Sequence, residues 1–399
     1  MMDNSELPAC QFRSGHSREF CYCVHPQIAI SRSPLQVLRA QCLRCDQADD
    51  RPHGGEPHLF HMPGGPARLQ NHETNSDAIN GPAFGATPCS PTRLAEVQAG
   101  PAADVNSAKS IPTVSQLHVL TCLFNPARSR KIVRNYHTFR QSLGDVPITV
   151  VELTLDDDPA IDSEALHIRG RRDRHCLWQK ERLLNLGLES LPADVDAVAW
   201  LDADILLPSA WYEQTLAALQ QAWVIQPYSW AHWLDEEQRV EHSFCSFSKW
   251  RGERSEKVYG HPGFGWAAHR EVLKHGFFDR HIVGGGDAWM CYAFDGDRRP
   301  VRWPSPPAPT WLIEEYDLWA ERTTALVKGQ MQFLSSDLIH LNHGKHSERR
   351  YHERAHWMMQ THLQSRHIVL DDNGLYTVQG NEPFRKKMID YFPARRDGS

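Results

Sequence analysis

The sequence predicts an α/β fold with a mostly parallel central sheet flanked by helices, and two observations predict it. Strand-like and helix-like runs alternate over residues 117–228, which is typical of the nucleotide-binding half of an open α/β sheet. The run 195–201 is apolar except for Asp196 and lies between Pro192 and Pro208. A short apolar run with such boundaries is expected to be a buried central strand.

The N-terminal segment, residues 1–112, differs in composition from the rest of the chain. All 13 tryptophans lie between Trp178 and Trp357. We expect 1–112 to be largely disordered, because it lacks the apolar residues needed to offset the entropy of ordering. Cys42 and Cys45 leave a zinc site open there, and a misassigned start codon is an equally open explanation of the segment.

The remaining chain is expected to form one domain over 113–370, followed by a C-terminal tail over 371–399. A net charge of −6 argues against general nucleic-acid binding. The sequence has no run of 18 or more apolar residues, so no membrane span is expected. The first residues lack a basic stretch followed by an apolar core, so a cytoplasmic location is expected.

The first half of the domain is assigned from its periodicity. A strand over 117–124 is followed by Asn125 and a proline, and then by a helix over 129–143 with apolar residues three and four apart. A strand over 148–153 follows. A crossover of this length predicts a parallel pair with a right-handed connection. After an arginine-rich stretch, a helix is expected over 177–188.

The second half is less regular. We expect a helix over 209–221 with Ser209 as its N-cap, and then a strand over 223–228. Residues 229–262 show no clear period, which is typical of a functional lid or of disorder. Short elements follow in the order strand, helix, helix, helix and strand, at 263–268, 269–275, 287–295, 312–327 and 337–341.

Two carboxylates, Asp202 and Asp204, directly follow the central strand. Residues two apart on an extended chain project to the same side, and α/β sheets bind ligands at the carboxyl ends of their strands. Two neighbouring carboxylates repel each other unless a cation lies between them, and oxygen ligands suit Mg²⁺ or Mn²⁺. The pattern predicts a divalent ion that holds a diphosphate, although many copies of D-x-D are solvated turns or helix caps.

Two further motifs could complete a site. Three glycines, Gly284 to Gly286, permit close approach of a ligand to the backbone, and Asp287 follows them either as a functional acid or as a helix cap. His343 lies at the end of the last strand, where it could be a third metal ligand. Lys345 and Arg349 could then bind phosphate, or they could belong to a solvated helix face.

Four motifs in this order resemble glycosyltransferases of the GT-A fold, especially bacterial galactosyltransferase-related and family 2-like enzymes. The motifs are W-Q-K-E-R-L-L-N, W-L-D-A-D, H-P-G-F-G-W-A with G-G-G-D, and L-N-H-G. The resemblance covers about 117–358 and implies a nucleotide-diphospho-sugar transferase. It implies that Asp202 and Asp204 hold Mn²⁺ or Mg²⁺ against the two phosphates of a nucleotide-sugar, and that His343 completes the metal site.

The same resemblance implies the other roles in the site. Asp287 is implied as the base, although animal β-1,4-galactosyltransferases carry a longer acidic run where this chain has G-G-G-D. The residues implied to shape the sugar and acceptor pocket are Trp266, Gly284, Gly285 and Gly286. The residues implied to line the nucleotide pocket or to reach the diphosphate are Asn125, Gln179, Lys180, Asn185, Arg169 and Arg171.

The expected activity is a metal-dependent, inverting transfer from a nucleotide-sugar, most simply UDP-linked, to a saccharide or lipid-linked acceptor. A lipid-linked acceptor is compatible with peripheral membrane contact. Three alternatives stay open: a retaining glycosyltransferase, a sugar nucleotidyltransferase and a non-catalytic carbohydrate-binding protein. The second normally has a glycine-rich loop after the first strand, which 123–131 lacks, and the third is suggested by the many tryptophans.

Overall fold

The structure of the protein is a computed structural model that describes six stretches of the chain. These are residues 13–14, 22–23, 111–253, 260–297, 308–344 and 346–395. The first two are β1 (Arg13–Ser14) and β2 (Tyr22–Cys23), which pair antiparallel. The other expectations about residues 1–110, including the open zinc site at Cys42 and Cys45, concern residues outside this description.

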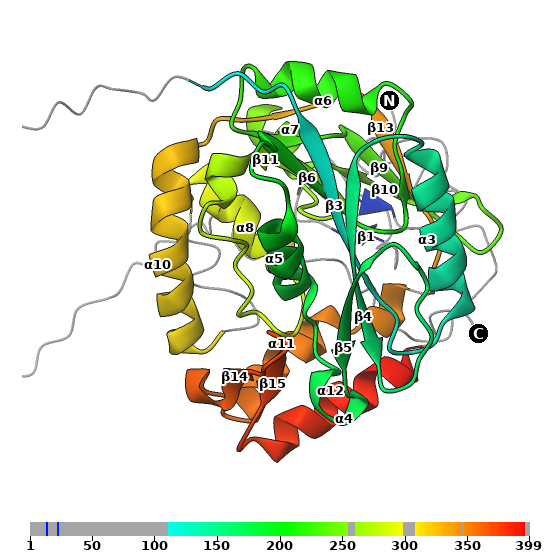
Figure 1. Ribbon diagram of the computed structural model, residues 1–399, viewed down its shortest axis with the longest axis vertical. Helices are drawn as coiled ribbons and strands as arrows, with labels where there is room; N and C mark the ends of the chain where they lie inside the picture. Colours follow the sequence, from blue (N-terminus) through cyan, green and yellow to red (C-terminus); the bar gives the residue numbers. More distant parts are fainter. Residues whose placement is uncertain are drawn as a thin grey trace, which may run out of the picture. The chain divides into compact units, whose positions relative to one another are not determined.

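The centre of the fold is a seven-stranded sheet with the order β12-β8-β11-β6-β3-β4-β5 (Figure 1). Its strands are β3 (Leu117–Phe124), β4 (Ile148–Leu155), β5 (Leu166–Gly170), β6 (Ala197–Leu201), β8 (Val224–Gln226), β11 (Gly265–His269) and β12 (Met331–Phe333). Strand β11 is antiparallel to both of its neighbours, and the other pairs are parallel. The predicted α/β fold with a mostly parallel sheet is therefore confirmed.

Strand β6 is buried on both faces, as the apolar run predicted. Val198 and Trp200 pack in one hydrophobic cluster, and Ala197, Ala199 and Leu201 pack in another. This division follows from the two-residue period of a strand. Because β6 is packed on both faces, the backbone that leads to Asp202 and Asp204 is held rigidly.

Helices cover the two faces of this sheet. The first cluster contains residues of α5 (Lys180–Ser190), α8 (Gly286–Asp295) and α10 (Thr310–Val327), whereas the second contains residues of α3 (Arg130–Ser142) and α6 (Trp211–Leu219). Ser129 caps α3 by accepting a hydrogen bond from the amide of Ile132. The expected cap at Ser209 is wrong, because the chain turns earlier: the amide of Trp211 donates to the carbonyl of Pro208, and Ala210 takes the cap position.

A second sheet, of four strands, includes two strands from the segment 229–262. Its order is β10 (Val240–Cys245), β9 (Trp230–Leu234), β13 (Asp337–His340) and β7 (Ile205–Leu206), and α7 (Phe247–Glu253) follows β10. The expectation of a lid or disorder is thus wrong for 230–253. The pairing partner of β9 lies about a hundred residues later, in β13, and a bulge interrupts the hairpin, so local periodicity could not indicate these strands.

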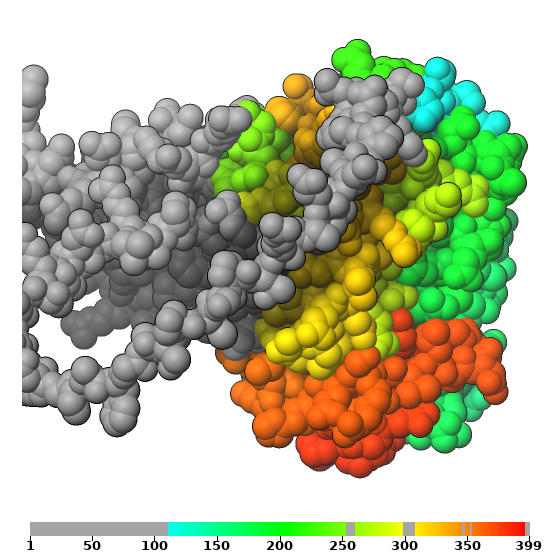
Figure 2. All heavy atoms as spheres, turned by 90° about the vertical axis from the view of Figure 1, so that its left-hand side faces the viewer, coloured from blue at the N-terminus to red at the C-terminus, as the bar shows by residue number. Residues whose placement is uncertain are grey.

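Residues 351–395 pack onto the domain, so the part of the predicted tail that the structure describes, 371–395, is folded. They contribute α11 (Tyr351–Gln360), β14 (Ile368–Leu370), β15 (Tyr376–Val378) and α12 (Glu382–Ala394). Phe392 stacks on Trp178 and meets Phe124 edge to face. Figure 2 shows these residues, orange to red, gathered at one end of the domain. No helix in the described stretches combines the length and apolar character needed to cross a bilayer.

Four short helical segments complete the description. Residues 172–175 form α4 (Arg172–His175), and 3-10 turns occur at Arg270–Leu273 and Ser365–His367. The helix expected over 269–275 is therefore a single 3-10 turn. A further 3-10 turn, His346–Arg349, directly follows the end of β13 and its loop.

Candidate active site

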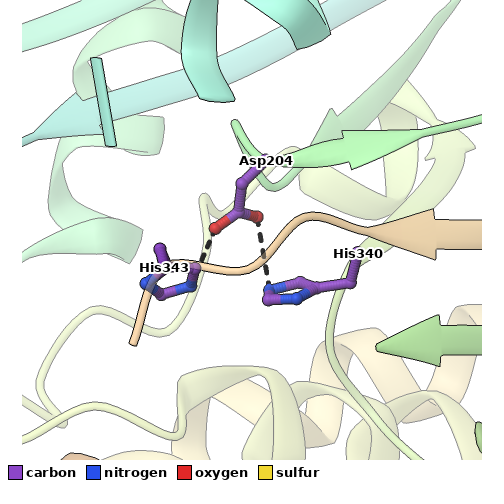
Figure 3. Close-up of side chains that lie close together, drawn as sticks. All are labelled: Asp204, His340 and His343. Carbon is purple, nitrogen blue, oxygen red and sulfur yellow. Dashed lines mark ion pairs between the residues drawn. The ribbon is translucent and has the colours of Figure 1, made fainter. Parts of the chain in front are cut away.

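Asp204, His340 and His343 form a compact group of metal-ligating side chains (Figure 3). The Oδ2 atom of Asp204 lies 2.9 Å from Nε2 of His343, and Oδ1 lies 3.5 Å from Nε2 of His340. Sheet pairing produces this arrangement, because β7 and β13 are antiparallel and place Ile205 opposite His340. The amide of Leu341 also donates to the carbonyl of Asp204 at 2.8 Å.

The protonation states in this group suit a metal ion. Burial alone would raise the pKa of Asp204, but His340, His343 and Arg349 outweigh it and lower that pKa below its usual value. Burial lowers the pKa of His340 well below its usual value. An ionised carboxylate beside a neutral imidazole is the combination that binds a divalent cation.

His340 was missed by the sequence analysis, which named only His343. Both histidines are buried, at 2% and 7% exposure, so neither is a solvated surface residue. The signal was present in the H-x-x-H spacing, with one histidine in the last strand and one just after it. The sequence could not show that Asp204 would pair beside both of them.

The loop that carries His343 is fastened to α3. The side-chain amide of Asn135 donates to the carbonyl of Asn342 at 3.0 Å, and Nζ of Lys131 lies 3.3 Å from its Oδ1. The Nδ2 group of Asn342 donates to the carbonyl of Leu234 in β9. The histidine therefore sits on a loop held by two separate elements.

Lys180, the first residue of α5, joins Asp202 to Asp287. Its Nζ lies 2.5 Å from Oδ1 of Asp202 and 2.9 Å from Oδ2 of Asp287. The other oxygen of Asp202 accepts from the amide of Phe264 at 3.2 Å. Asp202 and Asp204 thus turn to different partners, and a metal-binding role for Asp202 stays a prediction.

The electrostatics of this second group are set by burial. Burial raises the pKa of Asp202 to about 6, opposed by Lys180 and reinforced by Asp287. Burial alone would lower the pKa of Lys180, but Asp202 and Asp287 raise it well above its usual value. Lys180 is therefore a permanent cation between two carboxyl groups, and the Asp287 side chain is 18% exposed.

The glycine-rich turn before Asp287 needs its glycines for two different reasons. Gly284 and Gly285 have φ angles of +83° and +94°, a region that favours glycine. A Cβ atom on Gly286 would lie 2.3 Å from Oε1 of Glu181. Burial, and after it Asp287, raises the pKa of Glu181 to about 8. This second buried carboxyl group beside Asp287 was not singled out from the sequence.

Asn125 borders a cavity at the carboxyl ends of β3 and β4. The cavity has a volume of about 460 Å³, and its lining includes Glu152, Thr154, Asp157 and Asp158. The amide of Asn125 exchanges hydrogen bonds with the backbone of Ser129, at 2.8 and 3.0 Å, and so fixes the start of α3. The predicted wall position of Asn125 therefore coincides with an open volume where α/β sheets bind ligands.

Three predicted pocket residues, Gln179, Asn185 and Trp266, form hydrogen bonds within the protein. Gln179 accepts from the amide of Tyr376 and donates to the carbonyl of His175. Asn185 uses its whole amide on Phe277 and Asp279. Trp266 is fully buried, and its indole donates to the carbonyl of Pro262. All three side chains are buried and hydrogen-bonded within the protein, and their predicted roles in a ligand pocket stay predictions.

The predicted basic residues fall in different places. Arg169 is exposed on the edge strand β5, and the exposed Arg171 pairs with Asp173 at 3.0 Å. Arg349 lies in the site, with Nη2 2.6 Å from Nε2 of His343 and its guanidinium 4.3 Å from the ring centre of Trp233. The prediction for Lys345 falls outside the described residues.

Several solved structures are similar to this chain. A 4-diphosphocytidyl-2C-methyl-D-erythritol synthase from Anaerococcus prevotii is 10% identical over 55% of this chain and 87% of that chain, with a TM-score of 0.29. A glucosyl-3-phosphoglycerate synthase from Mycobacterium tuberculosis is 13% identical over 64% and 81%, with a TM-score of 0.32. The catalytic domain of Drosophila β1,4-galactosyltransferase 7 is 17% identical over 44% and 59%, with a TM-score of 0.23.

TM-scores of this size carry no argument about activity. No protein-family model and no curated protein sequence matches the chain. A proposal for the function must therefore be argued from the residues of the site.

Proposed function

We propose that the protein is a metal-dependent glycosyltransferase that moves a sugar from a nucleotide-sugar, most simply UDP-linked, to a saccharide or lipid-linked acceptor. One observation carries the proposal: the two aspartates of D-A-D turn to two different groups. Asp204 joins two histidines, and Asp202 joins Lys180 and Asp287. Transfer from a nucleotide-sugar needs both kinds of group, a cation for the leaving diphosphate and a base for the acceptor.

The donor set fits a divalent metal. Asp204, His340 and His343 would hold the ion, and their ligating atoms all lie within 4.8 Å of one another. When bound, the ion supplies positive charge that stabilises the leaving diphosphate. Two imidazoles and one carboxylate suit Mn²⁺ better than Mg²⁺, which prefers oxygen ligands and retains water.

Lys180 supports the same chemistry with a charge that the chain itself provides. Its ammonium group already contacts Asp202 and Asp287, and a lysine on a flexible stem can turn toward a phosphate oxygen. A move of Lys180 to the diphosphate would free Asp287 to accept the proton of the acceptor hydroxyl. Donor binding and activation of the base would then be linked through one side chain.

Asp287 is the proposed general base: it would take the proton of the acceptor hydroxyl while that oxygen attacks the anomeric carbon and the nucleoside diphosphate leaves. It follows a turn that permits close approach of a ligand, and it is partly exposed. The cavity that Asn125 borders at the ends of β3 and β4 supports a nucleoside position there. A single displacement at the anomeric carbon inverts its configuration, in keeping with one base and one leaving group.

The proposal is tested by incubating the purified chain with a panel of UDP-sugars and measuring UDP release with Mn²⁺, with Mg²⁺ and with EDTA. We expect release with Mn²⁺, less with Mg²⁺ and none with EDTA. NMR of a transferred product should show inversion of the anomeric configuration. Absence of release with every donor and metal would overturn the proposal, and retention would overturn the assignment of Asp287 as base.

A further inference from the structure

The guanidinium of Arg354 lies buried between three segments of the candidate active site. Arg354 is on α11 and is 1% exposed. Its Nε donates to the carbonyl of Arg349 at 3.0 Å, and its Nη1 donates to the carbonyl of Val283. No carboxylate in the described part of the chain forms an ion pair with it. Burial of a cation without such a partner costs free energy, so the other contacts of this guanidinium must compensate for it.

Aromatic rings surround the same guanidinium. Its central carbon lies 4.5 Å from the ring centre of Trp178, 5.0 Å from that of Tyr351 and 5.1 Å from that of Tyr391. Rings at this distance attract a cation through their faces. The backbone amide of Trp178 also donates to the carbonyl of Ile282 at 3.1 Å. The start of α5 and the glycine-rich turn are therefore joined here both directly and through Arg354.

Each of the three contacts leads directly to a group of the site. Trp178 precedes Lys180 by two residues, and Val283 precedes Asp287 by four. Arg349 places its own Nη2 2.6 Å from Nε2 of His343. Arg354 thus touches the segments that carry the ammonium group, the proposed base and one proposed metal ligand.

The glycine-rich turn lies so close to this cluster that a side chain would not fit. A Cβ atom on Gly284 would lie 2.6 Å from Nη1 of Arg354 and 3.0 Å from the ring of Trp178. The positive φ of Gly284 adds strain for any other residue. The turn before Asp287 is therefore seated on the guanidinium, and its position follows that of Arg354.

We propose that Arg354 is a positioning residue that holds two parts of the site in register. These are the base side, with Lys180 and Asp287, and the metal side, with Asp204, His340 and His343. A guanidinium can do this because its planar fork bonds two carbonyls in different directions while its face lies on Trp178, which an ammonium group cannot reproduce. The expected effect on the rate of transfer rests on the proposed function. The expected effect on the mobility of the backbone rests only on the contacts of Arg354.

The test compares Arg354→Lys with a matched control, Arg280→Lys. Arg280 also packs on two rings, of Trp311 and Tyr376, and it is bonded to Glu315 at 2.7 Å. Both substitutions keep the charge and remove the fork. Only the first concerns the site, so a general cost of losing a packed guanidinium would affect both variants alike.

For Arg354→Lys we expect kcat of transfer to fall by about 10 to 100-fold with the KM of the donor nearly unchanged, because small misplacements of a base are costly. We expect the pH profile of kcat to shift as well, since the contact between Lys180 and Asp287 loosens. Equal kinetics for the Arg354 and Arg280 variants would overturn the proposal. If Arg354→Lys does not fold, Gly284→Ala is the second variant. Its added Cβ atom would push the glycine-rich turn away from Arg354 and should lower kcat in the same way.

Hydrogen exchange separates this inference from the proposed function. In Arg354→Lys we expect faster amide exchange over 282–287 and over 346–349, with β4 unchanged, and no such change in Arg280→Lys. An inactive wild type would refute the transferase proposal, while this exchange pattern would still support the positioning role. Unchanged exchange in both segments would refute that role even in an active enzyme.

Discussion

The two sides of the candidate site are held in place by different kinds of structure. On the metal side, Asp204 and His340 are placed by strand pairing between β7 and β13. On the base side, Lys180 and Asp287 lie at the starts of two helices, α5 and α8, and are joined by an ion pair. Sheet register fixes the first pair, whereas the second depends on side-chain charge and on a turn of glycines.

This difference indicates which side can move. Backbone hydrogen bonds in a buried sheet open rarely, whereas a lysine on a flexible stem can exchange one charged partner for another. We therefore expect the metal side to be preformed and the base side to respond to the donor. Substitutions on one side at a time test whether the two sides differ in this way.

The largest effect is expected for Asp287→Asn on the base side. Asparagine keeps the shape but cannot accept the proton, so kcat should fall by about 10²- to 10⁴-fold, while Mn²⁺ affinity stays at the wild-type value. Steady-state kinetics measure kcat, and isothermal titration calorimetry measures the affinity for Mn²⁺. Turnover close to wild type would remove Asp287 from the mechanism.

The next effect is expected for His340→Ala on the metal side. Loss of one of three ligands should weaken Mn²⁺ binding by at least about tenfold, and raised Mn²⁺ should restore part of the activity. His232→Ala is the matched control, because His232 lies in the same sheet but pairs with Asp337. Equal Mn²⁺ affinity in the two variants would show that His340 is no ligand.

The contrast between the two sides also explains how far the sequence could predict the site. Periodicity predicted β6, and with it the position of Asp202 and Asp204, because a buried strand between prolines is a local signal. It missed β7 and β9, which pair with the distant β13, and β10, whose hairpin with β9 is interrupted by a bulge. His340 was missed for the same reason, since only the register of β13 places it beside Asp204.

Roles assigned by motif were less secure than positions assigned by period. Gln179, Asn185 and Trp266 belong to the matching motifs, yet each fills its hydrogen-bonding capacity within the protein interior. A motif states which residues occur together but not which way each side chain points. Lys180 and Asp287 point into the site because they occupy the first turns of helices that begin there.

A smaller effect, on stability, is expected for Gly286→Ala. The added Cβ atom would meet the carboxyl group of Glu181 at 2.3 Å, and such overpacking costs about 1–3 kcal/mol of unfolding free energy. Gly252→Ala is the control, because its nearest neighbour is 4.0 Å away, at Phe333. Urea unfolding measures both. A double variant with Glu181→Ala should recover most of the loss, and failure to do so would place the strain elsewhere.

The smallest effect concerns the pH dependence of stability and the carboxyl group of Glu181. Because burial raises the pKa of Glu181 from 4.5 to about 8, the folded state binds more protons than the unfolded state between these values. Stability should therefore fall as pH rises through this window, by at most about 1.4 kcal/mol per pH unit. Glutamine mimics the protonated acid, so Glu181→Gln should lose less stability than wild type between pH 5 and pH 8.

The control for this change is Glu189→Gln on the same helix, since Glu189 is exposed and its variant should follow the wild-type curve. Urea unfolding at several pH values gives the curves. Parallel curves for wild type and Glu181→Gln would mean that Glu181 is ionised at neutral pH. The base side would then hold an additional negative charge, and Lys180 would be shared among three carboxylates rather than two, which would make its release toward a diphosphate harder.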